Sequence, residues 1–353
     1  MTLRKGLAIF VFLSFCVSGT VLLFSVDGGT WRTILSARKG PLFIALGLVF
    51  AAWSCDALRF CCLSKAMSQK VPFSEGIVLT WLHYFGCAVT PMQVGGGPFQ
   101  VYVLYRSGVP IGKGIAITLI RTLLTTFLLS VVAPAAFFLD PRLLEGHAFI
   151  TGIFIYVLIF SVIIWLAFSL SIFRPDLIKK IGSVLVLWLK RFKILGSGRI
   201  LCTIKRINSE VDGYSKNLKQ LFSQGFLWFL LAFLLSVGHL LFLFSVLPCL
   251  IWSVGLEVHY MESLLAQAVF MFMLYFVPTP GASGVAEGGG AAIFGLLVPW
   301  NMAGVMAIAW RFFTEYLAIF MGAVVAIRII GWGTAEMIIQ NRGSKCDDLE
   351  GDG

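Results

Sequence analysis

The chain has 353 residues, of which 59% are hydrophobic and only 12% charged, whereas soluble globular domains carry about 25% charged residues. With a mean hydropathy of +0.93, this composition excludes a soluble globular protein. The net charge of +10 would suit nucleic acid, but the basic residues lie beside apolar segments, where they would meet anionic lipid headgroups instead. We therefore expect a membrane protein with no nucleic-acid partner.

Apolar runs long enough to cross a bilayer as helices, about 20 residues, recur along the chain. We predict six full spans, at residues 6–26, 41–63, 114–139, 148–173, 225–247 and 302–330. Two further apolar stretches, residues 76–90 and 264–277, are shorter and end at proline and glycine clusters, which favours re-entrant segments. Each is followed by a second short stretch that would return the chain to the same side. The predicted fold is an all-α polytopic membrane protein with six full spans plus two re-entrant helical hairpins.

The distribution of basic residues predicts the orientation of the chain. Residues 174–224 carry 11 of the 27 lysine and arginine residues and only three acids. Because basic loops stay on the cytoplasmic side, we expect this loop, the N-terminus and the C-terminal tail to be cytoplasmic. Residues 1–342 would form a single transmembrane domain, and residues 343–353 a disordered acidic tail.

Two parts of the sequence share one arrangement. Each has a short apolar stretch, a break rich in proline and glycine, a second short stretch, and a long helix that contains an arginine. The first break begins TPMQVGGGPFQVYVLYR at residues 90–106 and leads to Arg121, and the second reads PTPGASGVAE at residues 278–287 and leads to Arg311. The predicted topology inverts one unit relative to the other, and many transporters build a substrate site near the midplane from such an inverted repeat.

Charged residues inside predicted spans are costly and are therefore candidates for function. Asp56 and Arg59 are three residues apart, and Arg311 and Glu315 four apart, so each pair can meet on one helix face. For the first pair we favour a structural ion pair. Arg121 has no acid three or four positions away, so its partner must lie elsewhere. A lipid phosphate would suit its planar guanidinium.

We predict that Arg121 and Arg311 converge on one anion site, because equivalent positions of inverted units approach the same axis. Glu287 would form a static ion pair or exchange a proton, and we favour the ion pair. Glycines at the two breaks would either offer backbone N–H groups to an anion or allow close helix packing. Nearby polar residues would line a headgroup groove or cap an interface. These further candidates are Gly95, Gly96, Gly97, Gly281, Gly284, Gln93, Gln100, Tyr102 and Tyr105.

Two histidines, His83 and His239, stand alone in apolar runs, and we expect hydrogen-bonded structural roles for them. The sequence contains no H-E-x-x-H motif, and GVPIGKG at residues 108–114 lacks the spacing of a P-loop. We therefore expect no catalytic residue, no metal site, no cofactor and no enzymatic activity.

The two breaks also resemble a known family. PTPGASGVAE, with WRFFTEY at residues 310–316, resembles the second signature of the lysylphosphatidylglycerol synthase transmembrane region, also called the flippase-like domain family. TPMQVGGGPFQVYVLY, with GVPIGK at residues 108–113, is similar to the first signature, and the resemblance extends over about residues 41–328. It implies a protein of the bacterial or archaeal plasma (inner) membrane that moves or presents lipids between leaflets. We expect a stand-alone member without the soluble synthase domain, and so without aminoacyl transfer.

The leading hypothesis is therefore a lipid transporter that acts on an anionic phospholipid or a polyprenyl-phosphate type of lipid. Two alternatives stay open: an accessory membrane subunit of an envelope lipid or glycan synthesis complex, and a membrane enzyme of lipid modification. Besides membrane lipids, the partners left open are a second copy of the chain and an envelope-synthesis protein.

Overall fold

The computed structural model describes residues 3–25, 28–139, 148–173, 176–177, 180 and 225–330. Nearly all of the predicted cytoplasmic loop, residues 174–224, and the whole predicted tail, residues 343–353, lie outside these described residues. Within them the chain is helical, apart from connecting segments and one isolated β-bridge. The helices are α1 (Leu3–Ser25), α2 (Gly28–Leu35), α3 (Lys39–Ala66), α4 (Phe73–Ala88), α5 (Gly96–Arg106), α6 (Ile111–Leu139), α7 (Ala148–Phe173), α10 (Phe226–Phe244), α11 (Val246–Ser253), α12 (Tyr260–Leu274), α13 (Val285–Phe294), α14 (Trp300–Arg311) and α15 (Leu317–Val325), with π-helical turns η2 (Phe312–Tyr316) and η3 (Ala326–Ile330).

Five helical stretches in the described part of the chain are long and apolar enough to cross a membrane. They coincide with five of the six predicted spans and cover Gly6–Leu23, Lys39–Ala66, Ile111–Ala136, Phe226–Ser253 and Trp300–Arg328. The remaining predicted span is the 26-residue helix α7, which is not one of these five stretches, so the total of six is not confirmed. The protein is therefore a multi-pass membrane protein, as its composition predicts.

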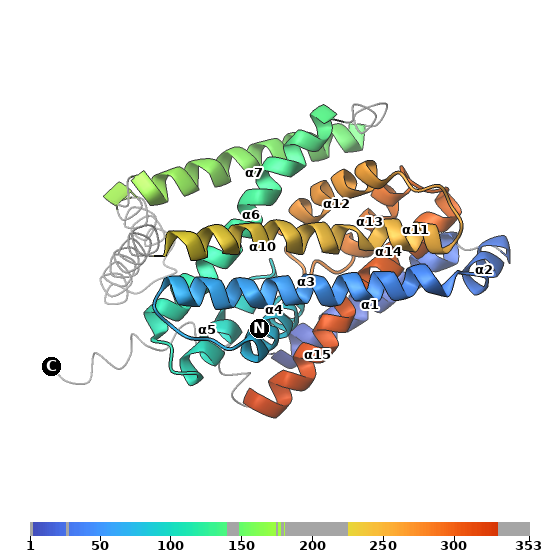
Figure 1. The fold of residues 1–353 in the computed structure, drawn as a ribbon. Helices are drawn as coiled ribbons and strands as arrows, with labels where there is room; N and C mark the ends of the chain where they lie inside the picture. The colour runs from blue at the N-terminus through green and yellow to red at the C-terminus, as the bar shows by residue number, and fades with distance from the viewer. Residues whose placement is uncertain are drawn as a thin grey trace, which may run out of the picture.

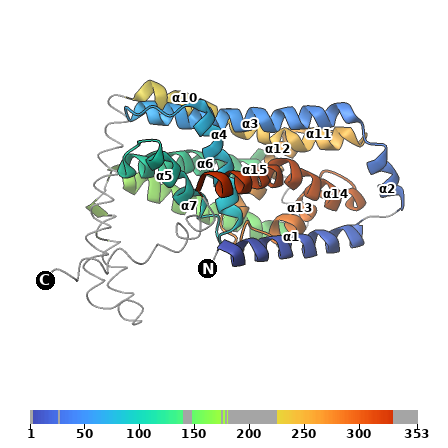
Figure 2. The ribbon, with the colours of Figure 1, turned by 90° about the horizontal axis from the view of Figure 1, so that it is seen from below.

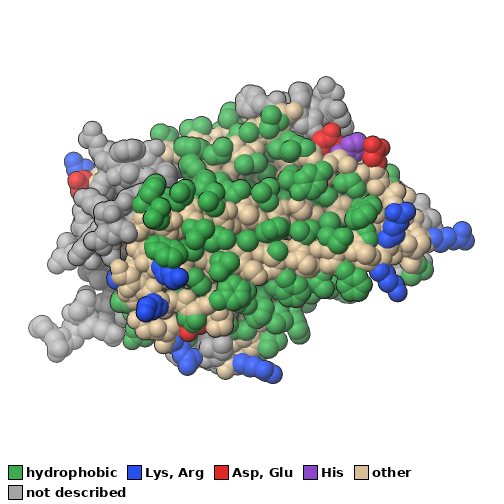
Figure 3. All heavy atoms as spheres, in the orientation of Figure 1, with side chains coloured by type: hydrophobic (Ala, Val, Ile, Leu, Met, Phe, Trp, Pro, Cys, Tyr) green, Lys and Arg blue, Asp and Glu red, His purple; other side chains and the backbone are tan. Residues whose placement is uncertain are grey.

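The face formed by α3 and α10 is covered with apolar side chains (Figure 3). Lysines mark the two ends of α3, Lys39 in its first turn and Lys65 in its last turn. Large apolar side chains between these ends are solvent-exposed in the isolated chain, among them Phe43, Ile44 and Phe50 on α3 and Leu227, Leu230 and Leu234 on α10. An apolar band of this size on an isolated protein indicates contact with lipid.

Helix α3 packs antiparallel along α10 and α11, and the three lie side by side in both views (Figures 1 and 2). At one end Arg38 N donates to Ser253 O over 2.7 Å. At the other end a Cβ on Gly225 would lie 2.7 Å from the carbonyl oxygen of Ala66. Only glycine permits this approach, so Gly225 fixes how closely the two helices meet.

The two short apolar stretches form helices α4 and α12, of 16 and 15 residues. Each is followed by a break and a second short helix, α5 after α4 and α13 after α12, with 11 and 10 residues. The first helix of each hairpin packs against the long arginine-containing helix of the other unit: α4 packs against α15, and α12 packs against α6. Figure 2 shows α3, α10 and α11 along one side of the molecule and α1 along the opposite side, with α4, α12 and α15 between them.

The two breaks share a residue offset and a pair of left-handed residues, although Gly95 (φ −71°) and its equivalent Gly284 (φ 90°) differ. Pro280 follows Pro91 by 189 residues (280 − 91), and the same offset relates the first residues of α5 and α13, and of α6 and α14. Met92 and Gln93 have positive φ angles of 53° and 54°, and their equivalents Gly281 and Ala282 have 58° and 51°. A left-handed non-glycine residue costs roughly 1–2 kcal/mol, and three of these four residues are not glycine, so the shared conformation is a specific feature of both breaks.

Pro91 and Pro280 form an antiparallel bridge with each other. Equivalent residues that meet in this way lie on the local two-fold axis that relates their segments, so the two breaks cross at that axis. Two hydrogen bonds join the segments at this crossing. Gly281 N donates to Cys87 O over 3.1 Å, and Gln93 Nε2 donates to Leu274 O over 3.3 Å.

Gln267 on α12 joins its own helix to α10 and α14. Its Nε2 donates to Phe244 O at the end of α10 over 2.6 Å, and its Oε1 accepts from Trp310 Nε1 on α14 over 2.8 Å. The Phe244 carbonyl needs this donor because the residue four positions on, Pro248, has no N–H.

We expect Gln267→Leu to destabilise the protein, because it leaves the Trp310 N–H and the Phe244 carbonyl unpaired, at about 1–3 kcal/mol for each group. Thermal unfolding in detergent measures this, with Gln69→Leu as the control. The Gln69 amide donates to Ser68 O at an exposed position, so its loss should change stability by under about 0.5 kcal/mol. Equal unfolding midpoints for the two variants would contradict this assignment.

Candidate functional site

A cavity of about 70 Å³ lies where the two breaks cross. A buried water needs about 10–15 Å³ of cavity volume, so the cavity holds about five waters or one small polar group. Residues of both units line it, from α3, α4, α6, α10, α12, α15, η2 and both breaks. Its charged lining residues are Arg59, Arg121 and Glu315.

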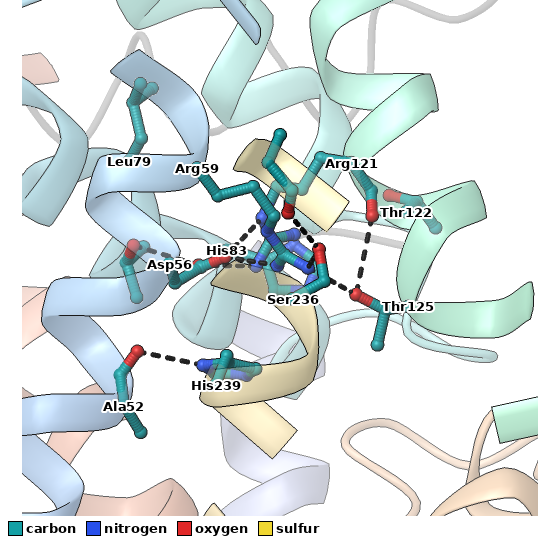
Figure 4. Close-up of polar contacts among 12 residues, drawn as sticks. Ala52, Asp56, Arg59, Leu79, His83, Arg121, Thr122, Thr125, Ser236 and His239 are labelled. Carbon is teal, nitrogen blue, oxygen red and sulfur yellow. Dashed lines mark hydrogen bonds and ion pairs between the residues drawn. The ribbon is translucent and has the colours of Figure 1, made fainter. Parts of the chain in front are cut away.

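The first group of charges, here called the Asp56 cluster, consists of Asp56, Arg59 and Arg121 (Figure 4). All three side chains are buried. Arg121 donates two hydrogen bonds to the Asp56 carboxylate, from Nε to Oδ1 over 3.0 Å and from Nη2 to Oδ2 over 2.6 Å. Arg59 Nη2 donates to Oδ1 and Thr80 Oγ1 to Oδ2. Four hydrogen bonds therefore saturate the Asp56 carboxylate.

Arg59 also connects the cluster to neighbouring helices. Its Nη1 donates to Thr125 Oγ1 on α6 over 2.7 Å and to Ser236 Oγ on α10 over 3.0 Å. These hydroxyls satisfy the donors but carry no charge. Since one carboxylate serves two guanidinium groups, the cluster has an excess of one positive charge beside the cavity.

The second group of charges, here called the Arg311 cluster, consists of Glu287, Arg311 and Glu315. Arg311 Nη1 lies 2.7 Å from Glu287 Oε1, an ion pair whose angles fall short of a hydrogen bond. Arg311 Nε donates to Glu315 Oε2 over 3.1 Å, and Nη2 donates to Gly281 O. With two carboxylates for one guanidinium, this cluster has an excess of one negative charge.

The two carboxylates of the Arg311 cluster differ in their environment. Glu287 also accepts hydrogen bonds from Gly284 N over 2.7 Å and from Tyr316 Oη over 2.9 Å, and its side chain is 0% exposed. Glu315 accepts only from Arg311 among the described residues, is 13% exposed and lines the cavity.

The structure corrects the predicted pairing of Arg121 with Arg311. Arg121 lines the cavity, but Arg311 is not one of the lining residues, so the two guanidinium groups do not converge on it. The second arginine of the cavity is Arg59, which the sequence assigned to a structural ion pair. Arg121 has its partner within the protein, Asp56, 65 positions away. The predicted pairs of Asp56 with Arg59 and of Arg311 with Glu315 are both present.

The glycines of the breaks serve backbone geometry more than anion binding. A Cβ on Gly96 would lie 2.3 Å from His83 Nδ1, and one on Gly95 would lie 2.5 Å from Gly86 O, so both allow close packing. Gly97 has space for a Cβ, with Thr118 3.7 Å away. Three of the five predicted N–H donors are already bonded: Gly95 N to Thr90 Oγ1, Gly281 N to Cys87 O and Gly284 N to Glu287 Oε2.

The polar candidates separate into two sets. Gln93 lines the cavity, whereas Gln100 is buried against α4, where its Nε2 donates to Leu79 O over 3.2 Å. Tyr102 and Tyr105 are not among the lining residues, and Tyr105 is exposed. Further hydrogen-bonding groups that the sequence did not single out as site residues, among them Thr125 and Tyr275, belong to the wall.

Both histidines line the cavity. His239 Nδ1 lies 2.9 Å from Ala52 O, so it donates a hydrogen bond to α3, which is the structural role predicted for it. His83 lies beside Cys87, with its ring nitrogens 3.7 and 3.9 Å from the sulfur.

Comparison with known proteins finds a family whose members this chain resembles over most of its length. The family model described as lysylphosphatidylglycerol synthase TM region matches residues 7–322, which include both breaks and both charged clusters. A UPF0104 membrane protein of Archaeoglobus fulgidus is 24% identical over 315 residues, which cover 89% of this chain and 94% of the relative.

We expect Asp56→Asn to lower stability by about 3–5 kcal/mol, because it leaves two buried guanidinium groups without a carboxylate. Asp56→Asn combined with Arg121→Gln restores the original excess of one positive charge and should regain part of this loss. Thermal unfolding of the two single variants and the double variant in detergent measures the coupling. A double variant no more stable than Asp56→Asn alone would mean that charge balance does not hold the cluster together.

Proposed function

Since the chain belongs to the lysylphosphatidylglycerol synthase transmembrane region family, we propose that it moves an anionic lipid between membrane leaflets by binding the headgroup phosphate in the central cavity. The observation that carries this proposal is the excess positive charge of the Asp56 cluster, which is buried and borders a cavity at the crossing of two helix breaks. One phosphate diester would neutralise that excess.

The hydrogen-bonding capacity of the cluster supports an anion. Arg121 uses Nε and Nη2 on Asp56, and its third nitrogen, Nη1, makes no hydrogen bond within the described residues. Tyr275 adds a hydroxyl group to the same wall, whereas the hydroxyls of Thr122 and Thr125 already donate to Thr118 O and Arg121 O. Guanidinium and hydroxyl donors around one small space are the groups that bind phosphate oxygens in proteins.

The size of the cavity limits what enters it. At about 70 Å³ it takes a phosphate with its nearest polar atoms and excludes acyl or prenyl chains, so the tails would remain in the lipid bilayer. Both candidate lipids present an anionic phosphate to it, a diester in phosphatidylglycerol and a monoester in a polyprenyl phosphate. We propose transport without chemical change of the lipid, and so without a catalytic residue or cofactor.

The proposed membrane arrangement has six spans, with α7 as the fourth. The α4–α5 and α12–α13 hairpins would be re-entrant from opposite sides, because none of these helices has the roughly 20 residues that a crossing needs. The left-handed residues shared by the two breaks and their antiparallel bridge support such an inverted repeat. We propose a bacterial or archaeal plasma membrane, with both termini and residues 174–224 cytoplasmic.

The test is lipid exchange in phosphatidylcholine vesicles that contain the purified protein. Trace amounts of fluorescent phosphatidylglycerol, polyprenyl phosphate or phosphatidylcholine are added, and the fraction accessible to an external quencher is followed. We expect faster exchange of the two anionic lipids than in protein-free vesicles. Arg59→Gln, which removes the charge excess but keeps the Asp56–Arg121 pair, should slow it about tenfold.

Lys70→Gln is the matched control, because Lys70 is exposed between α3 and α4 and lies outside the cavity wall. It removes one positive charge from the surface and should leave exchange unchanged. If no labelled lipid exchanges faster than in protein-free vesicles, or if Arg59→Gln transports anionic lipid at the parental rate, the proposed site is wrong.

A further inference from the structure

The charged side chains around the cavity balance to zero. Two arginines and one acid form the Asp56 cluster, and two acids and one arginine form the Arg311 cluster. The excess positive charge of one cluster therefore has its counter-charge in the excess negative charge of the other. Arg121 and Glu315 bring these two excesses to one cavity.

An anion that enters this balanced site adds an uncompensated negative charge. A buried charge without a partner costs several kcal/mol, and the Arg311 cluster already contains one acid too many. Loss of that extra negative charge would leave the site with one positive charge for the phosphate. One proton taken up by a carboxylate of the Arg311 cluster accomplishes this.

We propose that the protein moves one proton together with each anionic headgroup, and that Glu315 carries this proton. The proposal rests on the function proposed above. The proton passes from water on one side onto the Glu315 carboxylate as the phosphate binds beside Arg121, and it leaves to water on the other side when the lipid is released. No bond of the lipid forms or breaks, and no net charge crosses with the pair.

The hydrogen bonds identify Glu315 as the acceptor. Asp56 receives four hydrogen bonds, and Glu287 has two hydrogen-bond donors and the Arg311 ion pair. Glu315 has a single donor, Arg311 Nε at 3.1 Å, and is the only one of these three acids that lines the cavity in the described structure. A proton on Glu315 therefore breaks the fewest interactions, and it leaves Glu287 and Arg311 as a neutral pair.

Other groups that titrate surround this carboxylate. Arg311 and Tyr316 lie on its own continuous helix, and Glu287 on α13 shares Arg311 with it. Neighbouring elements contribute further titratable groups that face the cavity or bond to its wall. These groups are His83, Tyr84 and Cys87 on α4, Asp56 and Arg59 on α3, Arg121 on α6, His239 on α10, and Tyr275 in the second break.

These neighbours are poorer proton carriers for physical reasons. A proton on His83 or His239 would add positive charge beside a cluster that already has an excess of it. The Cys87 thiol donates to Gln93 O over 2.9 Å, and a tyrosine or thiol already holds its proton and cannot take up another near neutral pH. Protonation of Glu315 instead removes the excess negative charge of the Arg311 cluster.

The test uses the same vesicles, with fluorescent phosphatidylglycerol and an imposed pH difference across the membrane. With parental protein, the labelled lipid should accumulate in the leaflet on the alkaline side, by up to about tenfold per pH unit for one proton per lipid. Glu315→Gln keeps the size and polarity of the side chain but cannot take up or release a proton near neutral pH. It should exchange the lipid and reach equal leaflets whatever the pH difference.

Glu257→Gln is the control, because Glu257 is exposed between α11 and α12 and its loss should leave accumulation at the parental level. If Glu315→Gln unfolds, proton uptake by detergent-solubilised parental protein on addition of short-chain phosphatidylglycerol, read with a pH dye in weak buffer, supplies the test: uptake of about one proton supports the proposal, and no uptake overturns it.

Failures of the two proposals are distinguishable. Exchange by the parental protein without accumulation overturns proton coupling, and accumulation that persists in Glu315→Gln overturns Glu315 as the proton carrier. Both outcomes leave lipid transport standing. Absence of exchange at every pH overturns both.

Discussion

A helix that is interrupted among apolar helices exposes backbone N–H and C=O groups that water cannot reach, and these groups must find partners inside the protein. The two breaks meet this requirement largely through each other and through nearby side chains: Gly281 N bonds to Cys87 O, Gln93 to Leu274 O, and Arg311 to Gly281 O. The breaks therefore have to be neighbours. Their crossing brings α3, α6, α10 and η2 around one small space, and the cavity and both charged clusters depend on that arrangement.

The pairing of the buried charged side chains also follows from the absence of water around them. A buried guanidinium needs a carboxylate nearby, and the protein supplies acids in unequal numbers to two clusters, so that each is off balance by one charge while the six side chains together are neutral. Burial of such charges adds little to stability. The unequal distribution of acids between the clusters favours binding of a charged ligand over a role in helix packing alone. The proposed ligand is therefore an anion.

Much of the fold could be predicted from local patterns. Apolar length located five spans, the proline and glycine clusters located both breaks, and the spacing of three and four residues predicted the Asp56–Arg59 and Arg311–Glu315 pairs. All of these depend on residues close in sequence. The pairing of Arg121 with Asp56 depends on how α3 and α6 pack, and no periodicity within one helix contains that information.

The candidate site was predictable only in part for the same reason. Arg121 and Glu315 were identified because a charge within an apolar run is visible in the sequence. Arg59 was assigned to structure because its acid lies one turn away, although that acid is shared with a second helix. The break glycines appeared available to an anion, but Thr90, Cys87 and Glu287 occupy three of their N–H groups, and such local bonds become visible only once the turns are built.

The hydrogen bonds at the crossing of the two breaks depart from two-fold symmetry. Gly281 N donates to Cys87 O, but the related pair, Met92 N and Phe276 O, forms no such bond within the described residues. The two prolines at the axis have no N–H with which to lengthen the contact into a sheet. The contact therefore ends at a single bridge. Because Gln93 donates to Leu274 O whereas its equivalent Ala282 has no side-chain donor, the sequence itself makes the two halves of the crossing unequal.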